Sequence, residues 1–505
     1  MALTPVLVAL LLASPSPEPS LVLMHARVAD GTGAALQPDR AVVIAGDTIV
    51  AVEHAARYAP PPGARVIDAK GLVLAPGFID THSHADSGIL ERPGAETQVR
   101  QGITTVLGGQ DGGCECPLAD FFVKLERGGS AVNLASMAGF GTLREQALGE
   151  DNRRPARPDE IEKMKALLEG QLKAGAFGLS SGLEYEPGSY ATTDEIVEVA
   201  KVVKPYGGFY ISHVRDEGAK VIESYRELVE IARRAGIPGQ LTHMKLGSVS
   251  SWGRMPEYQA LMKEVDAEGG PRITGDCYPY TFWHTTLRAL VLSRRYDDLG
   301  DVKRGVDDNG GPDNIQLARY APNPSLEGKS LAVIAKEQGK DPYSVYMQMI
   351  QETEPKNRKP EWGDHVESIL GLSMREEDIR SFYGDPRVMV SSDGEIHGAH
   401  PRGAGAYARF LARYVRGANV MSLEEGVRRM TTLPASLLSL KDRGRVAPGM
   451  KADLVLFDPD KVEDRSTVKD PHAAPVGIPW VIVNGVPVVE AGGVTGARPG
   501  RVLRR

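Results

Sequence analysis

Apolar runs of strand length alternate with amphipathic stretches of helix length over most of the chain. This alternation is typical of repeated βα units, in which parallel strands form a sheet and helices cover it. The expected strands lie at residues 73–79, 103–108, 132–138, 177–181, 209–212, 240–242, 272–275 and 388–391. Eight units over roughly 370 residues suit a (β/α)8 TIM-like barrel with insertions better than an open sheet. We therefore predict an α/β barrel over residues 73–444.

The seventh βα unit is interrupted. Between the expected strands at 272–275 and 388–391, the chain is too long for one ordinary unit. Two stretches there are rich in charge, glycine and proline. We interpret residues 288–323 and 352–385 as inserts at the rim of the barrel.

The two ends of the chain carry short β-rich runs in place of βα units. Residues 21–72 contain several such runs, broken by glycine and proline. Residues 445–500 contain a matching block, in which Asn484-Gly485 lies between two expected strands as a hairpin turn requires. We expect both ends to pair into one small β-sandwich domain beside the barrel.

The first twenty residues differ from the rest. Thr4 to Ala13 form an apolar run as long as the core of a signal peptide, and the proline-rich segment that follows cannot continue a helix. Neither this run nor any later one reaches the ~20 apolar residues of a membrane span. We expect residues 1–20 to be a signal peptide and the protein to be exported. Since no Lys or Arg precedes the run, the alternative is a misassigned start codon and a cytoplasmic protein.

Composition narrows the function class. The chain has 505 residues, of which 42% are hydrophobic and 25% charged, as in ordinary globular proteins. Its 59 Lys and Arg against 66 Asp and Glu give a formal charge of −7, which makes nucleic acid a poor candidate partner. Three cysteines make no disulfide framework, and Cys114 and Cys116 are poorly spaced for bridging each other.

Histidine and acidic residues recur where the expected strands end, which is where barrel enzymes carry their catalytic groups. His82 and His84 follow the first strand. With a strand period of two, both imidazoles point to one side and reach one metal ion. His213, His243 and Asp393 follow the fifth, sixth and eighth strands. Because the chain has only 11 histidines, four of them at three strand ends indicate a metal site.

Longer motifs around these residues resemble the metal-dependent amidohydrolase superfamily. The run from Gly71 to His84 looks like its opening motif. Within the superfamily, the chain is similar to the D-aminoacylase (N-acyl-D-amino-acid deacylase) family. The motifs that carry this similarity lie at residues 175–183, 212–217, 276–281, 391–394, 400–402 and 449–458.

The resemblance implies a centre of one or two divalent metal ions, which we expect to be zinc. His82, His84 and Asp393 would hold one ion, and His213 and His243 the other. A divalent metal lowers the pKa of bound water to about 7 and so supplies hydroxide at neutral pH. Asp393 would act as general base during attack on the amide, and as general acid toward the departing amine.

One motif departs from the family pattern. The family carries a metal-bridging cysteine in a Gly-Asn-Cys-Gly turn, where this chain reads Gly109-Gln110-Asp111-Gly112. We favour Glu184, at the end of the fourth strand, as the bridging ligand. It supplies the carboxylate that a carboxylated lysine provides in related amidohydrolases. Asp111 and Cys114 are the alternatives.

The resemblance also implies substrate contacts. Lys245 and Tyr278 would bind the α-carboxylate of the substrate, because a cation and a phenol donor suit a carboxylate. Arg402, on the loop after the eighth strand, is a further candidate. Six residues after Tyr278, where a family member has a small hydroxyl side chain, this chain has His284. The pocket for the acyl group or the carboxylate is therefore expected to differ.

We predict metal-dependent hydrolysis of linear amides. The substrates implied are N-acyl-D-amino acids, or peptides with a D-residue next to the scissile bond, and the D-specificity is taken from the family. A cyclic-amide hydrolase or an isoaspartyl-type dipeptidase uses a similar site and is the alternative. A non-catalytic binding protein of the same fold is a third hypothesis, disfavoured because the implied histidines and Asp393 are all present.

Overall fold

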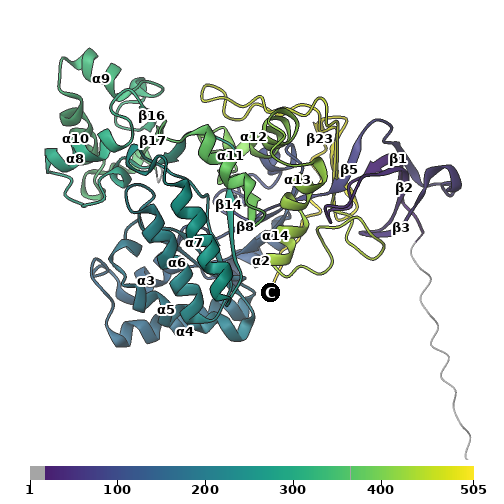
Figure 1. Cartoon of the computed structure of the whole chain (residues 1–505), viewed down its shortest axis with the longest axis horizontal. Helices are drawn as coiled ribbons and strands as arrows, with labels where there is room; N and C mark the ends of the chain where they lie inside the picture. Colours follow the sequence, from purple (N-terminus) through teal and green to yellow (C-terminus); the bar gives the residue numbers. More distant parts are fainter. Residues whose placement is uncertain (1–17, 364–365) are drawn as a thin grey trace, which may run out of the picture.

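The computed structural model describes residues 18–363 and 366–505 of the chain. Figure 1 shows three parts in a row, with a barrel in the middle, a β-sheet domain on one side and a mixed α/β insert on the other. The predicted signal peptide falls almost entirely on residues 1–17, outside the described residues, so export stays a prediction. Within the described ranges, every helix is too short or too polar to cross a bilayer.

Eight parallel strand positions form the barrel, which confirms the predicted fold. In chain order the strands are β6 (Phe78–Asp80), β8 (Ile103–Gly108), β9 (Asn133–Ser136) with its continuation β10 (Ala138–Gly139), β11 (Gly178–Gly182), β12 (Phe209–His213), β13 (Gly239–Leu241), β14 (Ile273–Cys277) and β18 (Val388–Val390). The ring closes where β19 (Gly394–Glu395) pairs in parallel with β7 (Ser83–His84).

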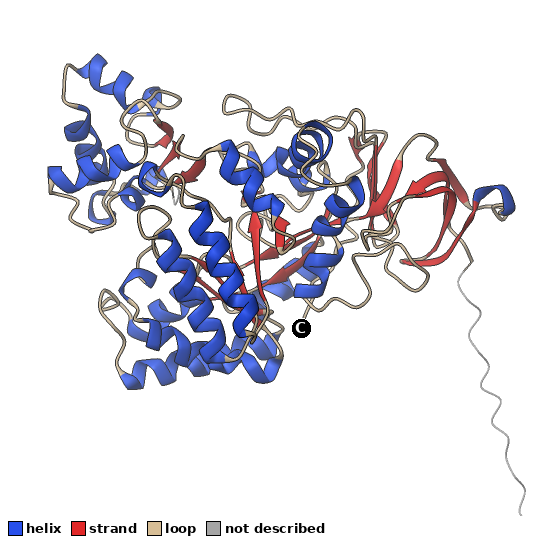
Figure 2. Ribbon diagram, in the orientation of Figure 1, coloured by secondary structure: helices blue, strands red, loops and turns tan. Residues whose placement is uncertain are grey.

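The helices cover the outside of these strands (Figure 2). They include α2 (Leu118–Gly128), α3 (Phe140–Leu148), α4 (Pro158–Ala174), α5 (Thr193–Ala200), α6 (Val221–Ala235), α7 (Met255–Glu268), α11 (Glu376–Gly384), α12 (Arg402–Arg409) and α13 (Leu423–Met430). In α6, the buried Tyr225, Leu228, Val229 and Ala232 recur at helical spacing and form one apolar face. The helix ends at Gly236, whose φ of 69° is the left-handed conformation that glycine adopts most readily.

An apolar cluster fills the barrel beneath the rim where the strands end. Five barrel strands contribute to it through Ile79, Leu107, Ala135, Ile211 and Met389. Leu433 and Leu437 of α14 (Thr432–Leu437) belong to the same cluster. The barrel interior is thus a packed core, and polar groups are concentrated at the rim.

The first expected strand, at 73–79, is two strands, so the prediction of a single one was wrong. β5 (Val73–Pro76) pairs with β1 (Leu21–Val28) and β20 (Leu454–Phe457) of the small domain, whereas β6 begins the barrel. The chain changes sheets at Gly77, where a Cβ atom would lie only 2.2 Å from Oγ1 of Thr104. A residue with a side chain does not fit there, and the change of sheet depends on glycine.

The small domain is a nine-stranded sheet built from both ends of the chain. Its strands are β1 (Leu21–Val28), β2 (Gln37–Ala45), β3 (Thr48–His54), β4 (Arg65–Asp68), β5, β20 (Leu454–Phe457), β21 (Trp480–Val483), β22 (Val486–Glu490) and β23 (Gly493–Val494). One face surrounds a core that includes Leu23, Ile44 and Leu456. The opposite face of β20 and β21 adds Val455 and Val481 to the main core of the barrel.

The interruption of the seventh unit is one insert. It contains the antiparallel strands β15 (Trp283–Thr285), β17 (Glu367–Gly371) and β16 (Ile315–Tyr320), with helices α8 (Leu299–Asp308), α9 (Leu331–Gln338) and α10 (Pro342–Glu352). The predicted inserts, 288–323 and 352–385, lie on both sides of the stretch that carries α9 and α10. Residues 376–384 of the second form α11, which contacts β14 and β18 as a barrel helix.

A buried ion pair between α3 and α5 generates the first prediction. Arg144 is fully buried and bonds to Glu195, which is 2% exposed. Replacing Arg144 with Ala leaves the Glu195 carboxylate buried without its partner, and we expect the free energy of unfolding to fall by about 3–5 kcal/mol. Urea unfolding measures this change. The control is Arg234→Ala, which removes exposed pairs with Glu230 and Asp194 and should cost roughly 0–1 kcal/mol. Equal losses in the two variants would contradict this interpretation.

Candidate metal centre

Imidazole and carboxylate groups meet at the rim where the barrel strands end. His82 follows β6, His213 ends β12, His243 comes two residues after the end of β13, and Asp393 lies between β18 and β19. All four side chains are buried. His84 is partly exposed, to 29%, and lines the cavity above the rim. The fold thus brings together the histidines and Asp393 that the strand ends predicted.

One group of ligand atoms forms around His82 and His84. Their Nε2 atoms lie 3.4 and 3.3 Å from Oδ1 of Asp393. The same two nitrogens lie 3.5 and 3.4 Å from the carboxylate of Asp111. Two imidazoles and two carboxylates therefore face one another. Together they provide four ligand atoms, which is a usual ligand set for a divalent metal.

Asp111 also belongs to a second group. His213 Nδ1 and His243 Nε2 are 2.9 Å apart, and His243 Nε2 is 3.6 Å from Asp111 Oδ1. Candidate ligand atoms of each group lie within 4.8 Å of one another, and Asp111 is common to both groups. Its backbone is left-handed, with φ of 53°, in the turn after β8. The turn directs this carboxylate between the two pairs of histidines.

Glu184 belongs to a third group of candidate ligand atoms, with His213 and Glu217. Its Oε2 is 2.7 Å from Nε2 of His213, the ring nitrogen opposite the one that faces His243. Glu217 stands in the same relation to His243, with Oε1 3.1 Å from Nδ1. Histidine ligands of metals commonly donate their second N–H to a carboxylate. The sequence prediction missed Glu217, although it lies four residues after His213 in the same motif.

In both groups of ligands, the neighbouring charges shift the pKa values in the direction opposite to the effect of burial. Burial alone would lower the pKa of His82, but the carboxylates of Asp111 and Asp393 raise it to about 10. Burial would raise the pKa of Asp111, yet His82 and His243 hold it well below its usual range. Oδ1 of Asp111 and both ring nitrogens of His82 are buried without a hydrogen-bond partner. Buried polar atoms of this kind require a partner, and a divalent cation fits this donor set.

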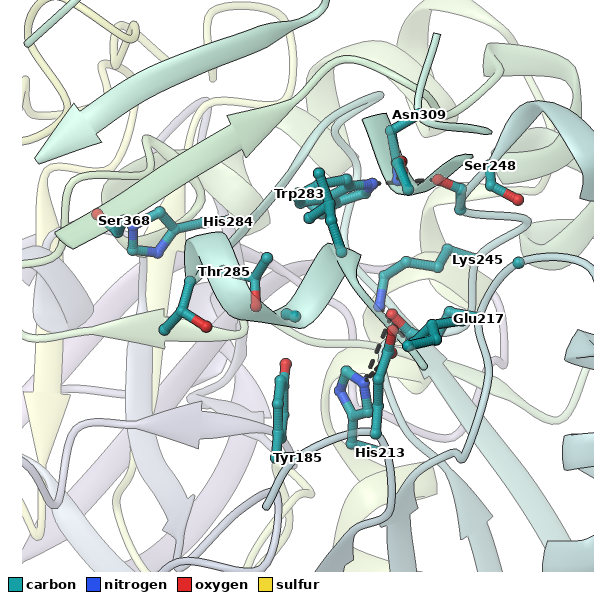
Figure 3. Close-up of a pocket in the computed structure, with 18 of the residues that line it drawn as sticks. Tyr185, His213, Glu217, Lys245, Ser248, Trp283, His284, Thr285, Asn309 and Ser368 are labelled. Atoms are coloured by element: carbon teal, nitrogen blue, oxygen red, sulfur yellow. Dashed lines mark hydrogen bonds and ion pairs between the residues drawn. The ribbon is translucent and has the colours of Figure 1, made fainter. Parts of the chain in front are cut away.

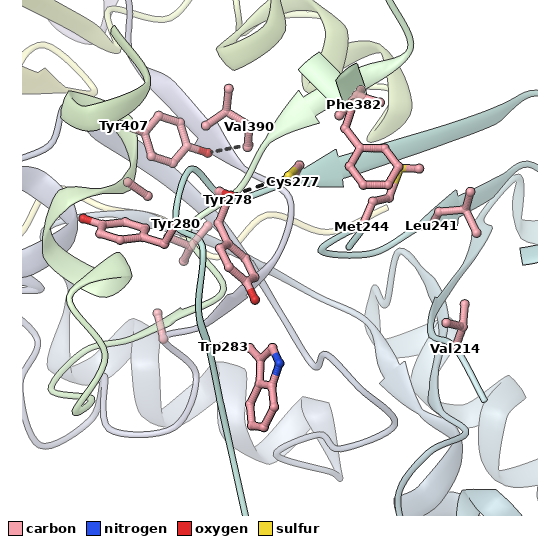
Figure 4. Close-up of a cluster of buried hydrophobic side chains, with 14 of the residues drawn as sticks. Val214, Leu241, Met244, Cys277, Tyr278, Tyr280, Trp283, Phe382, Val390 and Tyr407 are labelled. Atoms are coloured by element: carbon pink, nitrogen blue, oxygen red, sulfur yellow. Dashed lines mark hydrogen bonds between the residues drawn. The ribbon is translucent and has the colours of Figure 1, made fainter. Parts of the chain in front are cut away.

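The predicted substrate contacts occupy three different settings. Lys245 is buried on the cavity wall, with Nζ 2.7 Å from Glu217 Oε1. Arg402 also lines the cavity, and its Nη1 is 2.6 Å from Asp393 Oδ2. Tyr278 lies in a buried cluster with Trp283 and Tyr280 (Figure 4). Its hydroxyl donates to Met374 Sδ, and Arg402 and Lys245 lie 4.8 and 5.7 Å from the centre of its ring.

Cys114, an alternative to Glu184 as the bridging ligand, forms a disulfide. Cys114 is bonded to Cys116, so our expectation that these two residues are poorly spaced was wrong. The loop bends enough to bring their Cα atoms to 5.2 Å, inside the usual range of about 4.4–6.8 Å. A sulfur in a disulfide is not a thiolate, and Cys114 in this form is no metal ligand.

Both metal-ligand groups open into a cavity of about 1220 Å³. Figure 3 shows His213, Glu217 and Lys245 on the barrel side, and Trp283, His284 and Thr285 of β15 facing them from the insert. A bound molecule can therefore contact the ligand groups at one end while the rest of it extends under the insert.

Comparisons with known proteins identify the family of the chain. Residues 65–268 and 383–489 match the model of the amidohydrolase family. The chain is 33% identical to the N-acyl-D-glutamate deacylase of Alcaligenes xylosoxydans xylosoxydans, over 96% of each protein.

Two solved structures are similar over nearly the whole chain. The N-acyl-D-glutamate deacylase of Bordetella bronchiseptica, in complex with zinc and a phosphonate that mimics the tetrahedral intermediate, has a TM-score of 0.83 and 30% identity, covering 97% of this chain and 100% of that one. A D-aminoacylase with a binuclear metal centre has a TM-score of 0.83 and 32% identity, covering 96% and 100%. The chain belongs to the amidohydrolase family.

Proposed function

We propose that the protein is a metal-dependent hydrolase that removes the acyl group from N-acyl-D-amino acids. One observation carries this proposal: four imidazoles and two carboxylates converge on the rim of a barrel of the amidohydrolase family. The substrate class is supported by the deacylase that matches the chain over 96% of both lengths. The proposal extends to D-residues joined to a larger acyl group.

The ligand set we propose has Asp111 at its centre. His82, His84 and Asp393 would hold one ion, His213 and His243 would hold the second, and Asp111 could serve both. Asp111 takes the bridging place that we expected for Glu184. Its carboxylate belongs to two of the three candidate ligand groups and so lies between the two pairs of histidines, whereas Glu184 belongs only to the third group, with His213 and Glu217. We assign Glu184 and Glu217 the role of orienting the imidazoles.

The metal and the protein supply different parts of the chemistry. A bound divalent metal such as zinc lowers the pKa of water to about 7 and polarises the scissile carbonyl. Asp393 is positioned to handle protons, because Oδ1 faces the histidines while Oδ2 is held by Arg402. Burial would raise its pKa, but Arg402 and His82 keep it well below the usual range. Asp393 is thus a carboxylate at neutral pH, able to accept a proton from water and pass it to the amine.

Two buried cations suit the α-carboxylate of the substrate. Lys245 and Arg402 both line the cavity beside the ligand groups, and a cation binds a carboxylate strongly where water is excluded. Tyr278 contacts these cations through its ring. We therefore give Tyr278 the role of holding Lys245 and Arg402 in position, in place of the direct contact that we expected.

Substrate class is tested with a panel of amides. We expect N-acetyl-D-amino acids to be hydrolysed with kcat/KM roughly 10²-fold or more above that of their L-enantiomers. The reason is that the carboxylate and the scissile amide are both fixed, so the side chain of only one enantiomer points into the cavity. Hydantoins and isoaspartyl dipeptides complete the panel. Turnover of these compounds alone would point to a cyclic-amide hydrolase or an isoaspartyl-type dipeptidase.

The role of Asp393 is tested by Asp393→Asn. The amide keeps the size of the side chain but accepts no proton, and we expect kcat to fall by about 10²–10⁴-fold. Steady-state kinetics and metal analysis of the same preparation measure the effect. The control is Asp266→Asn on α7, whose side chain is 63% exposed and which should keep normal activity. A fully active Asp393→Asn enzyme would contradict the assignment.

The bridging ligand is tested by metal content. We expect Asp111→Asn to lose at least one of two equivalents, because both ions share this carboxylate. Glu184→Gln should keep both ions with an affinity lower by about 10–100-fold. Asp111→Cys, which restores the family residue, should bind two. Plasma emission spectrometry and competition with a chelator give both quantities. Loss of an ion from Glu184→Gln, with none lost from Asp111→Asn, would return the bridging role to Glu184.

A further inference from the structure

His400 is a buried imidazole that the proposed chemistry does not use. It is 4% exposed and lies in the loop between β19 and α12. This loop follows Asp393 and leads to Arg402, the first residue of α12. Burying a polar ring costs free energy unless its nitrogens are hydrogen-bonded. The partners of His400 therefore indicate what the ring does.

The two ring nitrogens of His400 bind backbone groups of different elements. Nδ1 accepts a hydrogen bond from N of Arg402 at 2.9 Å. Nε2 lies 3.0 Å from O of Phe282, the residue before β15. A carbonyl oxygen accepts and a backbone N–H donates, so these partners require the neutral tautomer with its hydrogen on Nε2. One ring thus ties the first residue of α12 to the start of the insert.

The surroundings of His400 keep the ring in this state. Phe282 stacks on it, with ring centres 4.4 Å apart. Tyr280 and Tyr278, in the cluster of Figure 4, meet it edge to face at 5.4 and 6.1 Å. Burial and the charge of Arg402 hold the pKa of His400 well below its ordinary value. The ring is therefore neutral at neutral pH, and Nδ1 can accept a hydrogen bond.

Arg402 depends on this bond because little else anchors it. As the first residue of α12, it has an N–H without a partner inside the helix. Its Nη1 is 2.6 Å from Oδ2 of Asp393, and its guanidinium lies over the ring of Tyr278. Its Nε is buried and, among the described residues, has no hydrogen-bond partner. A long side chain has many rotamers to lose, so its direction depends on where its backbone is fixed.

We propose that His400 is a positioning residue for Arg402. By accepting the N–H of Arg402 while donating to Phe282, it sets the guanidinium at the cavity wall, beside Asp393. There Arg402 binds the α-carboxylate of the substrate, a step for which this inference rests on the proposed function. Because the second bond of the ring goes to Phe282, the start of the insert takes part in holding the carboxylate site in place.

Variants of His400 separate its two bonds. In His400→Asn, the side-chain oxygen can replace Nδ1 as the acceptor for Arg402. In His400→Gln, the longer amide can replace Nε2 as the donor to Phe282, and His400→Phe removes both bonds but keeps a ring. For an N-acetyl-D-amino acid, we expect KM to rise at least about tenfold in His400→Phe and His400→Gln, and less than about threefold in His400→Asn, because hydrogen bonds to charged groups are the strong ones. If His400→Phe does not fold, the comparison of His400→Asn with His400→Gln carries the test.

The α-carboxylate gives a second measurement. The primary amide of the same N-acetyl-D-amino acid lacks the charge that Arg402 binds. We expect the ratio of kcat/KM between the acid and its primary amide to fall at least about tenfold in His400→Phe. In an Arg402→Gln background, His400→Phe should change this ratio no further, since two residues that act through one contact are not additive.

The control is Tyr258→Phe on α7. It removes a buried hydrogen bond to Asp385 at 2.8 Å, far along the chain from the loop of His400, and should keep the KM and the ratio of the wild type. Urea unfolding of the same preparations shows how much stability each variant loses. A control that changes KM as much as His400→Phe would overturn the inference.

The outcomes separate this inference from the proposed function. Unchanged KM in His400→Phe and His400→Gln would overturn the role of His400 and leave the deacylase proposal standing. Equal losses for the acid and its primary amide would also overturn it, in favour of a purely structural role. So would a KM in His400→Asn as high as in His400→Gln. No turnover of any linear amide by the wild type would overturn the proposed function, and this inference with it.

Discussion

The closure of the barrel between its first and last strands is the constraint on which the site depends. Asp80 at the end of β6 is fully buried and accepts hydrogen bonds from N of Ser392 at 3.1 Å and from N of His82 at 3.3 Å. The N–H of Asp393 donates to the carbonyl of His82 at 2.9 Å. One carboxylate therefore fixes the strand ends that carry His82 and Asp393, residues separated by most of the chain. Without these hydrogen bonds of Asp80, the distance between His82 and Asp393 would not be fixed.

The same concentration of charge explains why the site attracts cations. Asp111 and Asp393 are buried carboxylates, and isolated buried charges are costly unless they are paired. Protons and divalent ions compete for the imidazole nitrogens nearby. The carboxylates that raise the pKa of His82 to about 10 attract both. Metal binding at such a site is therefore linked to pH and releases protons.

Much of this site was predictable because its residues lie at strand ends. Barrel enzymes carry their catalytic groups at the carboxyl ends of the strands. This rule and the chain order of the strands were enough to predict that His82, His213 and Asp393 lie close together. Loop geometry was not readable in the same way. The bend that joins Cys114 to Cys116 and the turn that aims Asp111 depend on tertiary packing. The change of sheet at Gly77 was hidden because the apolar run continues through it.

The position of Asp111 suggests how this member of the family differs from those with a cysteine. The turn is held by close contacts: a Cβ at Gly112 would lie 2.8 Å from N of Gly182, at the end of β11. This close packing holds the turn next to Asp111, so we expect a cysteine at position 111 to change the ligand atom and to leave the turn in place. A thiolate is a soft ligand, whereas a carboxylate oxygen is hard and suits manganese or iron as well as zinc. If Asp111 holds the metal as we propose, exchanging sulfur for oxygen in this turn would change the metal preference without changing the fold.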